Sequence, residues 1–199
     1  MSTNRVHPIR SIVVSALFAA SMAAGAIIII PIGIVPITLQ TLFVLLAGLL
    51  GGPRIALTST AAYLLLGTMG LPVFSGGIGG IAHFASPTGG FLIGLFFMAA
   101  VAGAFSWLSE RIARSRGVRL VIVSFGVLCA SVVLYAIGLP LLRVRLGLDW
   151  TKTFAVGLLP FIPGDIIKII ASVVLYDLFR KKISAFLYLR WGENDYELP

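Results

Sequence analysis

An acidic and a basic residue stand three positions apart inside an otherwise apolar stretch near the end of the chain. Asp165 and Lys168 belong to the run Pro160-Phe-Ile-Pro-Gly-Asp-Ile-Ile-Lys, which has hydrophobic residues on both sides. At bilayer depth an ionisable side chain costs about 2.5–3.5 kcal/mol, and it usually faces a bundle interior, a partner or a ligand. In a helix these two residues share a face. The pair therefore has two interpretations: an internal ion pair that offsets its own burial, or a site that recognises a polar ligand.

The stretch 71–90 is the second unusual segment, because it is rich in glycine and carries no formal charge. Pro72 and Pro87 interrupt it, while glycines such as Gly77 give it conformational freedom, so a regular helix is not expected. Irregular backbone at membrane depth is tolerated only where it is buried in protein or lines a wet cavity. We expect a loop at the outer face that forms part of a binding chamber. A phosphate-binding loop is not indicated, because the Gly-x-x-x-x-Gly-Lys-Ser/Thr pattern is absent from the sequence.

Three more polar residues belong to the same predicted region. Thr38 and Gln40 open a short apolar run, where they are either interfacial residues or residues that close over an outward-facing cavity. His83 is either a neutral hydrogen-bonding group near the pocket or a structural residue. With one cysteine, two histidines and no metal-ligand spacing in the sequence, we expect no metal site.

The composition indicates what must position these residues. Of 199 residues, 59% are hydrophobic and only 11% are charged, which is typical of an integral membrane protein. The apolar runs are continuous rather than alternating, so they predict helices and not strands. The first run continues past its small residues, which favours a membrane span over a cleaved signal peptide. We predict a single all-α membrane domain over residues 1–199, a six-helix bundle with spans at 11–30, 37–50, 54–71, 89–109, 119–142 and 157–179, the last one broken near Pro160 and Pro163.

The formal charge of +8 is distributed by topology rather than as a nucleic-acid patch. If the N-terminus is cytoplasmic, the basic residues of the connecting segments fall mostly on the inner side, so both termini are expected in the cytoplasm. The inner set is Arg5, Arg10, Arg54, Arg111, Arg114, Arg116, Arg119, Arg180, Lys181, Lys182 and Arg190, and the outer set is Arg143, Arg145 and Lys152.

The first predicted span carries small residues at fourfold spacing. Ala16, Ala20 and Ala24 fall on one helical face. In lipid, such a face permits close helix packing. It is expected either to pack inside this protein or to dock a separate membrane subunit.

Three segments together resemble a known family. They are Pro36-Ile-Thr-Leu-Gln-Thr-Leu, Gly70-Leu-Pro-Val-Phe-Ser-Gly-Gly with Ser86-Pro-Thr-Gly-Gly-Phe, and Pro160-Phe-Ile-Pro-Gly-Asp-Ile-Ile-Lys. In this order they resemble the BioY family, the biotin-specific substrate-binding (S) subunits of prokaryotic energy-coupling factor (ECF) transporters. The resemblance implies a multi-pass protein of the cell membrane that binds biotin near the outer surface. It also implies partners, a membrane coupling subunit (T component) and two cytoplasmic ABC-type ATPases that use ATP, and no cofactor of its own.

The resemblance also assigns roles to residues of this sequence. It implies that Asp165 and Lys168 contact the ligand, together with the element Thr88, Gly89 and Gly90 and the region of Gln40. The family's usual glycine before that element is Ser86 here, so the local turn is expected to differ. Biotin offers ureido N–H donors for a carboxylate and a carboxylate tail for a cation, and which charge meets which group stays open. Its apolar part would lie against residues such as Phe74, Phe91 and Leu39.

Other function classes remain to be weighed. The same features allow an S subunit or a solitary transporter for another small vitamin. An intramembrane enzyme is disfavoured, because the sequence shows neither paired membrane aspartates nor a metal cluster. A scaffold without a ligand would leave the glycine-rich loop unexplained.

Overall fold

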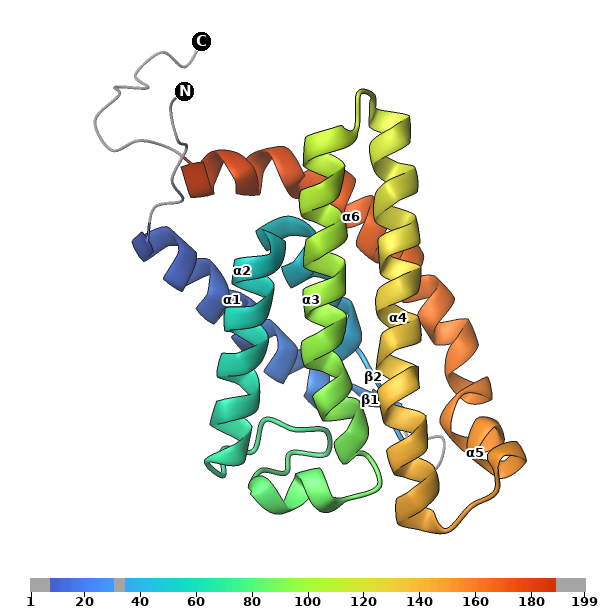
Figure 1. Cartoon of the computed structure of the whole chain (residues 1–199). Coiled ribbons are helices and arrows are strands. Elements are labelled where there is room, and N and C mark those ends of the chain that lie inside the picture. Colours follow the sequence, from blue (N-terminus) through green and yellow to red (C-terminus); the bar gives the residue numbers. More distant parts are fainter. Residues whose placement is uncertain (1–7, 31–34, 189–199) are drawn as a thin grey trace.

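The computed structural model describes residues 8–30 and 35–188 (Figure 1). Arg5 and Arg190 of the predicted inner set lie outside these residues. Within them, five helical regions are long and apolar enough to cross a membrane. The chain is therefore a mostly helical, multi-pass membrane protein, as the composition predicted. The regions are α1 (Pro8–Ile27), α2 (Gln40–Thr68), α3 (Gly89–Ile112), α4 (Arg116–Leu146), and Trp150–Leu187, which contains α5 (Trp150–Gly157), the 3-10 turn η2 (Leu159–Phe161) and most of α6 (Ile162–Tyr188).

Helix α2 contains two of the predicted spans, 37–50 and 54–71. Gly52 inside it has φ +70° and ψ −177°, which is not helical, and Pro53 follows directly. The positive φ suits glycine, and the chain changes direction here (Figure 1). The described residues thus contain five membrane-length helices rather than six, because the second and third predicted spans are joined through this bend.

The break predicted in the last span is present. The turn η2 ends at Phe161 and α6 begins at Ile162, so Pro163 lies in the first turn of α6. Proline is tolerated there because its missing N–H would have no intrahelical acceptor. Asp165 follows in the same turn, where the helix dipole favours a negative charge. The sequence around the charged pair therefore also sets where its helix starts.

The prediction of helices without strands is wrong at one place. Strand β1 (Ile29–Ile30) pairs antiparallel with β2 (Ile37–Thr38), at the end of the first predicted span and the beginning of the second. Leu39 N–H also donates to the Gly25 carbonyl at 3.0 Å. Backbone polar groups in an apolar setting need partners, and this pairing supplies them while it leads the chain back from α1 into α2.

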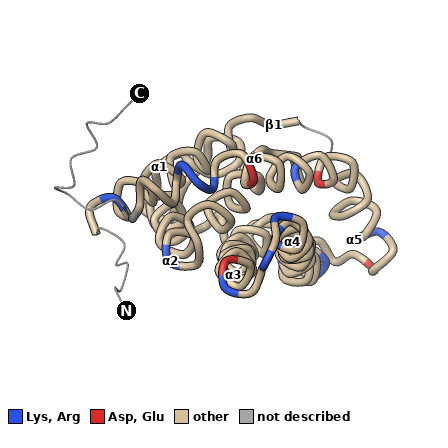
Figure 2. The backbone as a smooth tube through the Cα atoms, turned by 90° about the horizontal axis from the view of Figure 1, so that it is seen from above, with Lys and Arg blue, Asp and Glu red and all other residues tan. Residues whose placement is uncertain are grey.

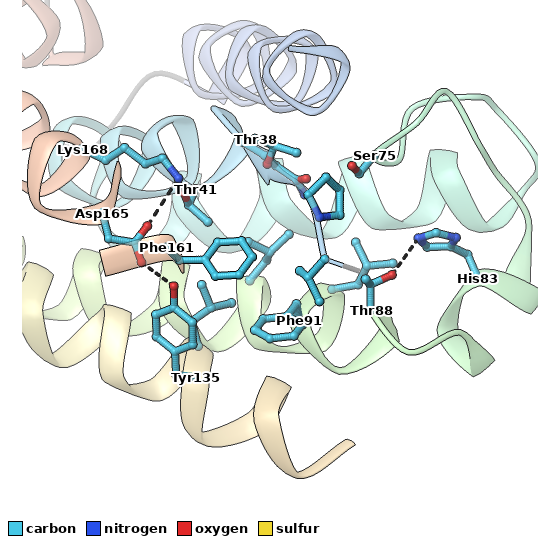
Figure 3. Close-up of a pocket in the computed structure, with 16 residues that line it drawn as sticks. Thr38, Thr41, Ser75, His83, Thr88, Phe91, Tyr135, Phe161, Asp165 and Lys168 are labelled. Atoms are coloured by element: carbon cyan, nitrogen blue, oxygen red, sulfur yellow. Dashed lines mark hydrogen bonds and ion pairs between the residues drawn. The ribbon is translucent and has the colours of Figure 1, made fainter. Parts of the chain in front are cut away.

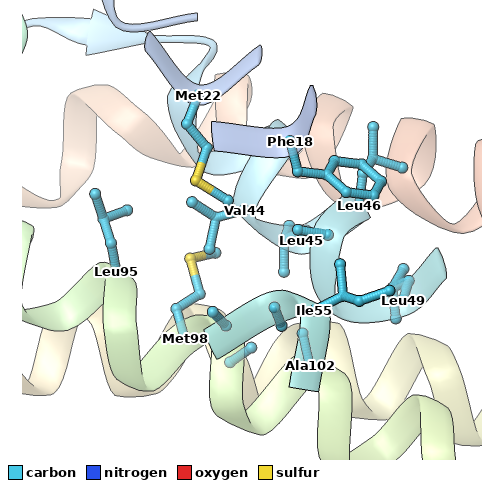
Figure 4. Close-up of a cluster of buried hydrophobic side chains, with 14 of the residues drawn as sticks. Phe18, Met22, Val44, Leu45, Leu46, Leu49, Ile55, Leu95, Met98 and Ala102 are labelled. Atoms are coloured by element: carbon cyan, nitrogen blue, oxygen red, sulfur yellow. The ribbon is translucent and has the colours of Figure 1, made fainter. Parts of the chain in front are cut away.

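The core is centred on α1, α2 and α3 and continues onto α4 and α6. Helix α2 contacts α1, α3 and α6, and α3 packs along α4. Figure 4 shows Phe18 and Met22 of α1 facing Val44 and Leu45 of α2, with Met98 of α3 below them. Met22 and Val44 are fully buried. This packing places α2 at the centre of the bundle, in contact with α1, α3 and α6.

The two ends of the bundle differ in charge. The start of α1, the bend of α2, the α3–α4 connection and the end of α6 lie at one end, at the top of Figure 1, where Arg10 Nη1 donates to the Phe186 carbonyl at 2.9 Å. Figure 2 views the bundle from this end, whose elements carry more basic than acidic residues: Arg10, Arg54, Arg111, Arg114, Arg116, Arg119, Arg180, Lys181 and Lys182 against Glu110 and Asp177. The β1–β2 pair, the segment 69–88 with its 3-10 helix η1 (Ile81–Ala85), and α5 lie at the opposite end.

Candidate functional site

A cavity of about 90 Å3 lies at the end of the bundle that carries the β1–β2 pair. Figure 3 shows the labelled lining residues converging from segments far apart in the sequence. The lining combines apolar side chains with a few polar and charged ones, the combination that small-molecule sites use for affinity and orientation. The lining residues are Val35, Pro36, Thr38, Gln40, Thr41, Ser75, His83, Thr88, Phe91, Leu92, Leu95, Leu134, Tyr135, Phe161, Asp165 and Lys168.

The charged pair lies at one end of this cavity. Lys168 Nζ is 3.3 Å from Asp165 Oδ1 and donates to Thr41 Oγ1 at 3.1 Å. Tyr135 donates its phenolic hydrogen to Asp165 Oδ2. The side chains of Lys168 and Asp165 are only 9% and 19% exposed. Each carboxylate oxygen therefore has one protein donor, and the pair is held by neighbours from α2 and α4.

Two other lining groups have no partner within the described residues. Gln40 is 5% exposed, and its Nε2 makes no hydrogen bond there. The Ser75 hydroxyl, across the cavity on the glycine-rich segment, is likewise buried without a partner. A buried polar group left unpaired costs about 1–3 kcal/mol. Both groups line the same cavity, so a polar ligand there would satisfy them.

The glycine-rich segment is anchored on α2. Tyr63 donates to the Val73 carbonyl at 3.1 Å, and the Gly80 N–H donates to the Gly67 carbonyl at 2.7 Å. Gly67 must be a glycine, because a Cβ there would lie 2.1 Å from the ring of Phe74. This close approach buries Phe74 fully and holds the segment over the cavity.

His83 links this anchored segment to the cavity. Its ring stacks on Phe74 with centroids 5.4 Å apart, and its Nε2 is 3.4 Å from Thr88 Oγ1 (Figure 3). Burial lowers the pKa of His83 below its ordinary value near 6.5. The imidazole is therefore neutral at pH 7, which agrees with the neutral hydrogen-bonding role predicted for it.

Seven of the eleven predicted binding residues line the cavity, and four do not. Phe74 lies behind His83, and Gly77 is exposed with a positive φ. Gly89 and Gly90 are buried at the start of α3, where a Cβ would lie 2.1 Å from the Phe84 carbonyl oxygen and 2.6 Å from Leu141 Cβ respectively. Their contact with a ligand stays a prediction. The seven lining residues are Thr38, Gln40, His83, Thr88, Phe91, Asp165 and Lys168.

The departure at Ser86 has a structural explanation. Its backbone is extended, with φ −70° and ψ 164°, a conformation open to any residue. Its hydroxyl lies 3.0 Å from Thr88 Oγ1. Serine therefore fits this turn without strain and adds a contact to the predicted element.

Several lining residues were not predicted from the sequence. Tyr135 is the clearest, because it contacts both Asp165 and the ring of Phe91, whose centroid is 6.1 Å away. A tyrosine in a long apolar run needs a partner for its hydroxyl, and that signal was present. Ser75 and Phe161 carried no comparable signal, since only the fold brings them to the cavity.

The alanine face of α1 points away from the bundle. Ala16, Ala20 and Ala24 are all exposed, while Val14, Phe18 and Met22 form the buried face. These exposures disfavour packing of the alanine face inside this protein, and its docking to a separate membrane subunit stays a prediction.

A helical membrane bundle with a small polar and apolar cavity near one end defines a membrane protein that binds a small solute. The chain belongs to the BioY family, whose sequence model matches residues 1–185. This is a transporter family and not an enzyme family.

Individual relatives agree with this assignment over most of the chain. The biotin transporter BioY of Rhizobium etli is 46% identical over 173 residues, covering 83% of this chain and 90% of the relative. The biotin transporter BioY of Thermotoga maritima is 34% identical over 166 residues, covering 83% and 93%. A solved structure, the S-component for biotin from an ECF-type ABC transporter, matches with a TM-score of 0.78 and 31% identity over 94% of this chain and 99% of that one.

Proposed function

We propose that this protein is the biotin-binding S subunit of an ECF-type uptake transporter. The observation that carries the proposal is the cavity itself, which combines the buried Asp165–Lys168 pair with the unpaired polar atoms of Gln40 and Ser75. Biotin matches this set, because it has N–H donors, two acceptor groups and an apolar ring and chain. The aromatic side of the cavity, with Phe91 and Phe161, suits the apolar part.

The hydrogen bonds that Asp165 and Lys168 already make determine which of their donors and acceptors remain free for the ligand. Tyr135 and Lys168 each donate to one oxygen of Asp165, so the carboxylate keeps lone pairs for the ureido N–H groups. Lys168 has a further donor for the biotin carboxylate or carbonyl. Both charges thus stay paired while the ligand is bound.

Equilibrium binding to the purified protein in detergent tests this function. We expect biotin to bind with a stoichiometry of one, and thiamine and riboflavin to leave the calorimetric signal flat. Desthiobiotin, which keeps the ureido group, separates recognition of that group from recognition of the thiophane ring. Binding of another vitamin with no response to biotin would overturn the substrate assignment while leaving the family intact.

The proposed arrangement in the membrane follows the charge distribution. We propose that the bend at Gly52 divides α2 into two membrane segments, giving six in all, and that both termini face the cytoplasm of a prokaryotic cell. The limb Gln40–Gly51 is about 18 Å long at 1.5 Å per residue, so it crosses only part of the bilayer. The cavity then faces outward, where biotin enters. Cysteine labelling at position 114 from either side of intact cells tests the orientation.

The exposed alanine face is proposed to dock the membrane coupling subunit, which two ABC-type ATPases drive with ATP. Ala16, Ala20 and Ala24 allow a partner helix to approach closely. The variant Ala20→Leu should keep biotin binding and lose co-purification with the coupling subunit. A matched control is Leu17→Ile, which changes shape at another exposed position of α1 without adding bulk. ATP-independent uptake by the protein alone in vesicles would favour the solitary-transporter alternative.

A further inference from the structure

A second and far larger hollow lies at the opposite end of the bundle from the biotin cavity. Its volume is about 1090 Å3, and we call it the basal cavity. Four segments surround it, the start of α1, the bend of α2, the end of α3 and the end of α6. Its lining residues are Pro8, Ser11, Ile12, Leu49, Leu50, Gly51, Gly52, Pro53, Arg54, Ile55, Ser106, Trp107, Glu110, Tyr176, Arg180, Lys181, Ser184 and Leu187.

The bend of α2 creates the space. Pro53 packs so tightly on α3 that a Cβ at Gly103 would lie 2.7 Å from Pro53 Cα. The chain turns at this contact, and Gly51 and Gly52 bring no side chain into the hollow. On the other side, the end of α6 is held over the bundle by Leu187, which is 3% exposed. The basal cavity lies between these two fixed elements.

Cations exceed anions around the basal cavity. The lining contains Arg54, Arg180 and Lys181, with Glu110 as the carboxylate. Glu110 Oε1 already accepts from Tyr176 at 2.9 Å and from Arg180 at 3.1 Å, and Arg119 lies 3.5 Å from it. Glu110 is thus neutralised by its own neighbours and leaves the other cations uncompensated.

Arg54 and Lys181 are those uncompensated cations. Within residues 8–30 and 35–188, neither side chain makes a hydrogen bond or an ion pair. They belong to α2 and α6 and line the same hollow from two sides. An anion between them would be paired from both helices, as a phosphate group prefers.

The floor of the basal cavity is apolar. Ile12, Leu49, Leu50, Ile55 and Leu187 line it beside Trp107. A free phosphate or the phosphates of a soluble nucleotide would bury no apolar area against such a surface. The glycerol and acyl region of a phospholipid would. Trp107 is 47% exposed, as expected for a tryptophan at a membrane interface. Arg54 and Lys181 together with the apolar floor match an amphiphile with an anionic head group.

We propose that the basal cavity binds one anionic phospholipid, with its phosphate between Arg54 and Lys181 and its acyl region against the apolar floor. With the orientation proposed above, this lipid comes from the cytoplasmic leaflet. The site would make assembly of the end of α6 with the bend of α2 dependent on the acidic lipid content of the membrane. It is separate from the biotin cavity and shares no lining residue with it.

Native mass spectrometry of the full-length, delipidated protein tests the proposal. On titration with phosphatidylglycerol we expect one lipid to bind at least about tenfold more tightly than phosphatidylcholine, since each basic residue near a membrane surface adds about 1 kcal/mol of attraction to anionic lipid. Arg54→Gln with Lys181→Gln should remove this preference. Arg54→Lys with Lys181→Arg, which keeps both charges, should retain it.

The matched control removes two charges from the same end outside the cavity. Arg114→Gln with Lys182→Gln changes the net charge equally, and both residues are exposed and do not line the cavity. Equal loss in the control would overturn the site in favour of general surface attraction. Competition by millimolar inorganic phosphate would overturn the lipid assignment in favour of a soluble phosphate. Biotin binding is measured on the same samples, so a failure here is distinguishable from a failure of the proposed function.

Discussion

Helix α6 carries charged residues at both ends of the bundle, and the two clusters differ in burial. Near its start, Lys168 and Asp165 are 9% and 19% exposed and line the cavity proposed to bind biotin. Further along the helix, Asp177, itself 15% exposed, pairs with Arg116, which is 75% exposed, so only the cation of this second pair lies largely in solvent. Breaking a buried pair leaves an uncompensated charge and costs about 3–5 kcal/mol, whereas an exposed pair contributes about 0–1 kcal/mol. The same chemistry thus forms a largely buried pair in the wall of the cavity at one end and a pair with a solvent-exposed cation at the other.

The largest effect is expected from Lys168→Met. Methionine keeps most of the side-chain volume and removes the cation, so Asp165 loses the partner at 3.3 Å. We expect biotin affinity to fall at least about a hundredfold, equivalent to about 3 kcal/mol, measured by calorimetry. Arg116→Gln, which breaks the exposed pair, should leave the affinity unchanged. Unchanged affinity in both variants would make the buried pair structural and remove the contrast between the two ends.

The next effect is expected from Tyr135→Phe. This change removes the hydrogen bond to Asp165 Oδ2 and keeps the ring against Phe91. A single hydrogen bond to a charged group is worth about 1.5–3 kcal/mol, so the affinity for biotin should fall about tenfold or more.

Tyr176→Phe is the matched control for this change. Tyr176 is equally an α-helical tyrosine whose hydroxyl donates to a carboxylate, that of Glu110, at 2.9 Å. It lies at the basal end, on the other side of the core from the biotin cavity. We expect this variant to bind biotin as tightly as the wild type. A similar loss in both tyrosine variants would mean that the effect of Tyr135 is on stability and not on the site.

Sequence reasoning predicted the buried charge cluster better than the fold around it. Asp165 and Lys168 stood out because charge is rare in apolar runs, and the prolines before them marked the start of the helix. The bend at Gly52 was predicted only as a boundary between the spans 37–50 and 54–71, because composition does not reveal that the two limbs continue as one bent helix packed on α3. Ser75 and Phe161 could not be predicted, since their places depend on how distant segments meet. The sequence predicts that the hydroxyl of Tyr135 needs a hydrogen-bond partner, but it does not reveal that this partner is Asp165.

A smaller effect is expected at the exposed pair itself. Asp177→Asn removes the ion pair with Arg116 and should lower the thermal unfolding midpoint by only about 1–2 °C at low salt. The difference should vanish at about 1 M salt, where the Debye length is about 3 Å. Thermal unfolding at both salt concentrations measures this. A lowered unfolding midpoint that persists at high salt would show that the Arg116–Asp177 pair stabilises the fold as strongly as the Asp165–Lys168 pair.

The smallest effect concerns the pH dependence of stability. It arises from His83, which lies at the cavity end of the bundle. Burial lowers the pKa of His83 in the folded protein, so the unfolded chain binds its proton more readily. The stabilising contribution of the neutral imidazole is complete above about pH 6.5 and is lost as the pH falls through the lowered folded pKa. The unfolding midpoint of the wild type should therefore drop between pH 7 and pH 5 more steeply than that of His83→Gln. His7→Gln is the matched control, because it removes the other histidine of the chain. Equal slopes for wild type and His83→Gln would show that the stacked imidazole over the biotin cavity does not couple protonation to the fold.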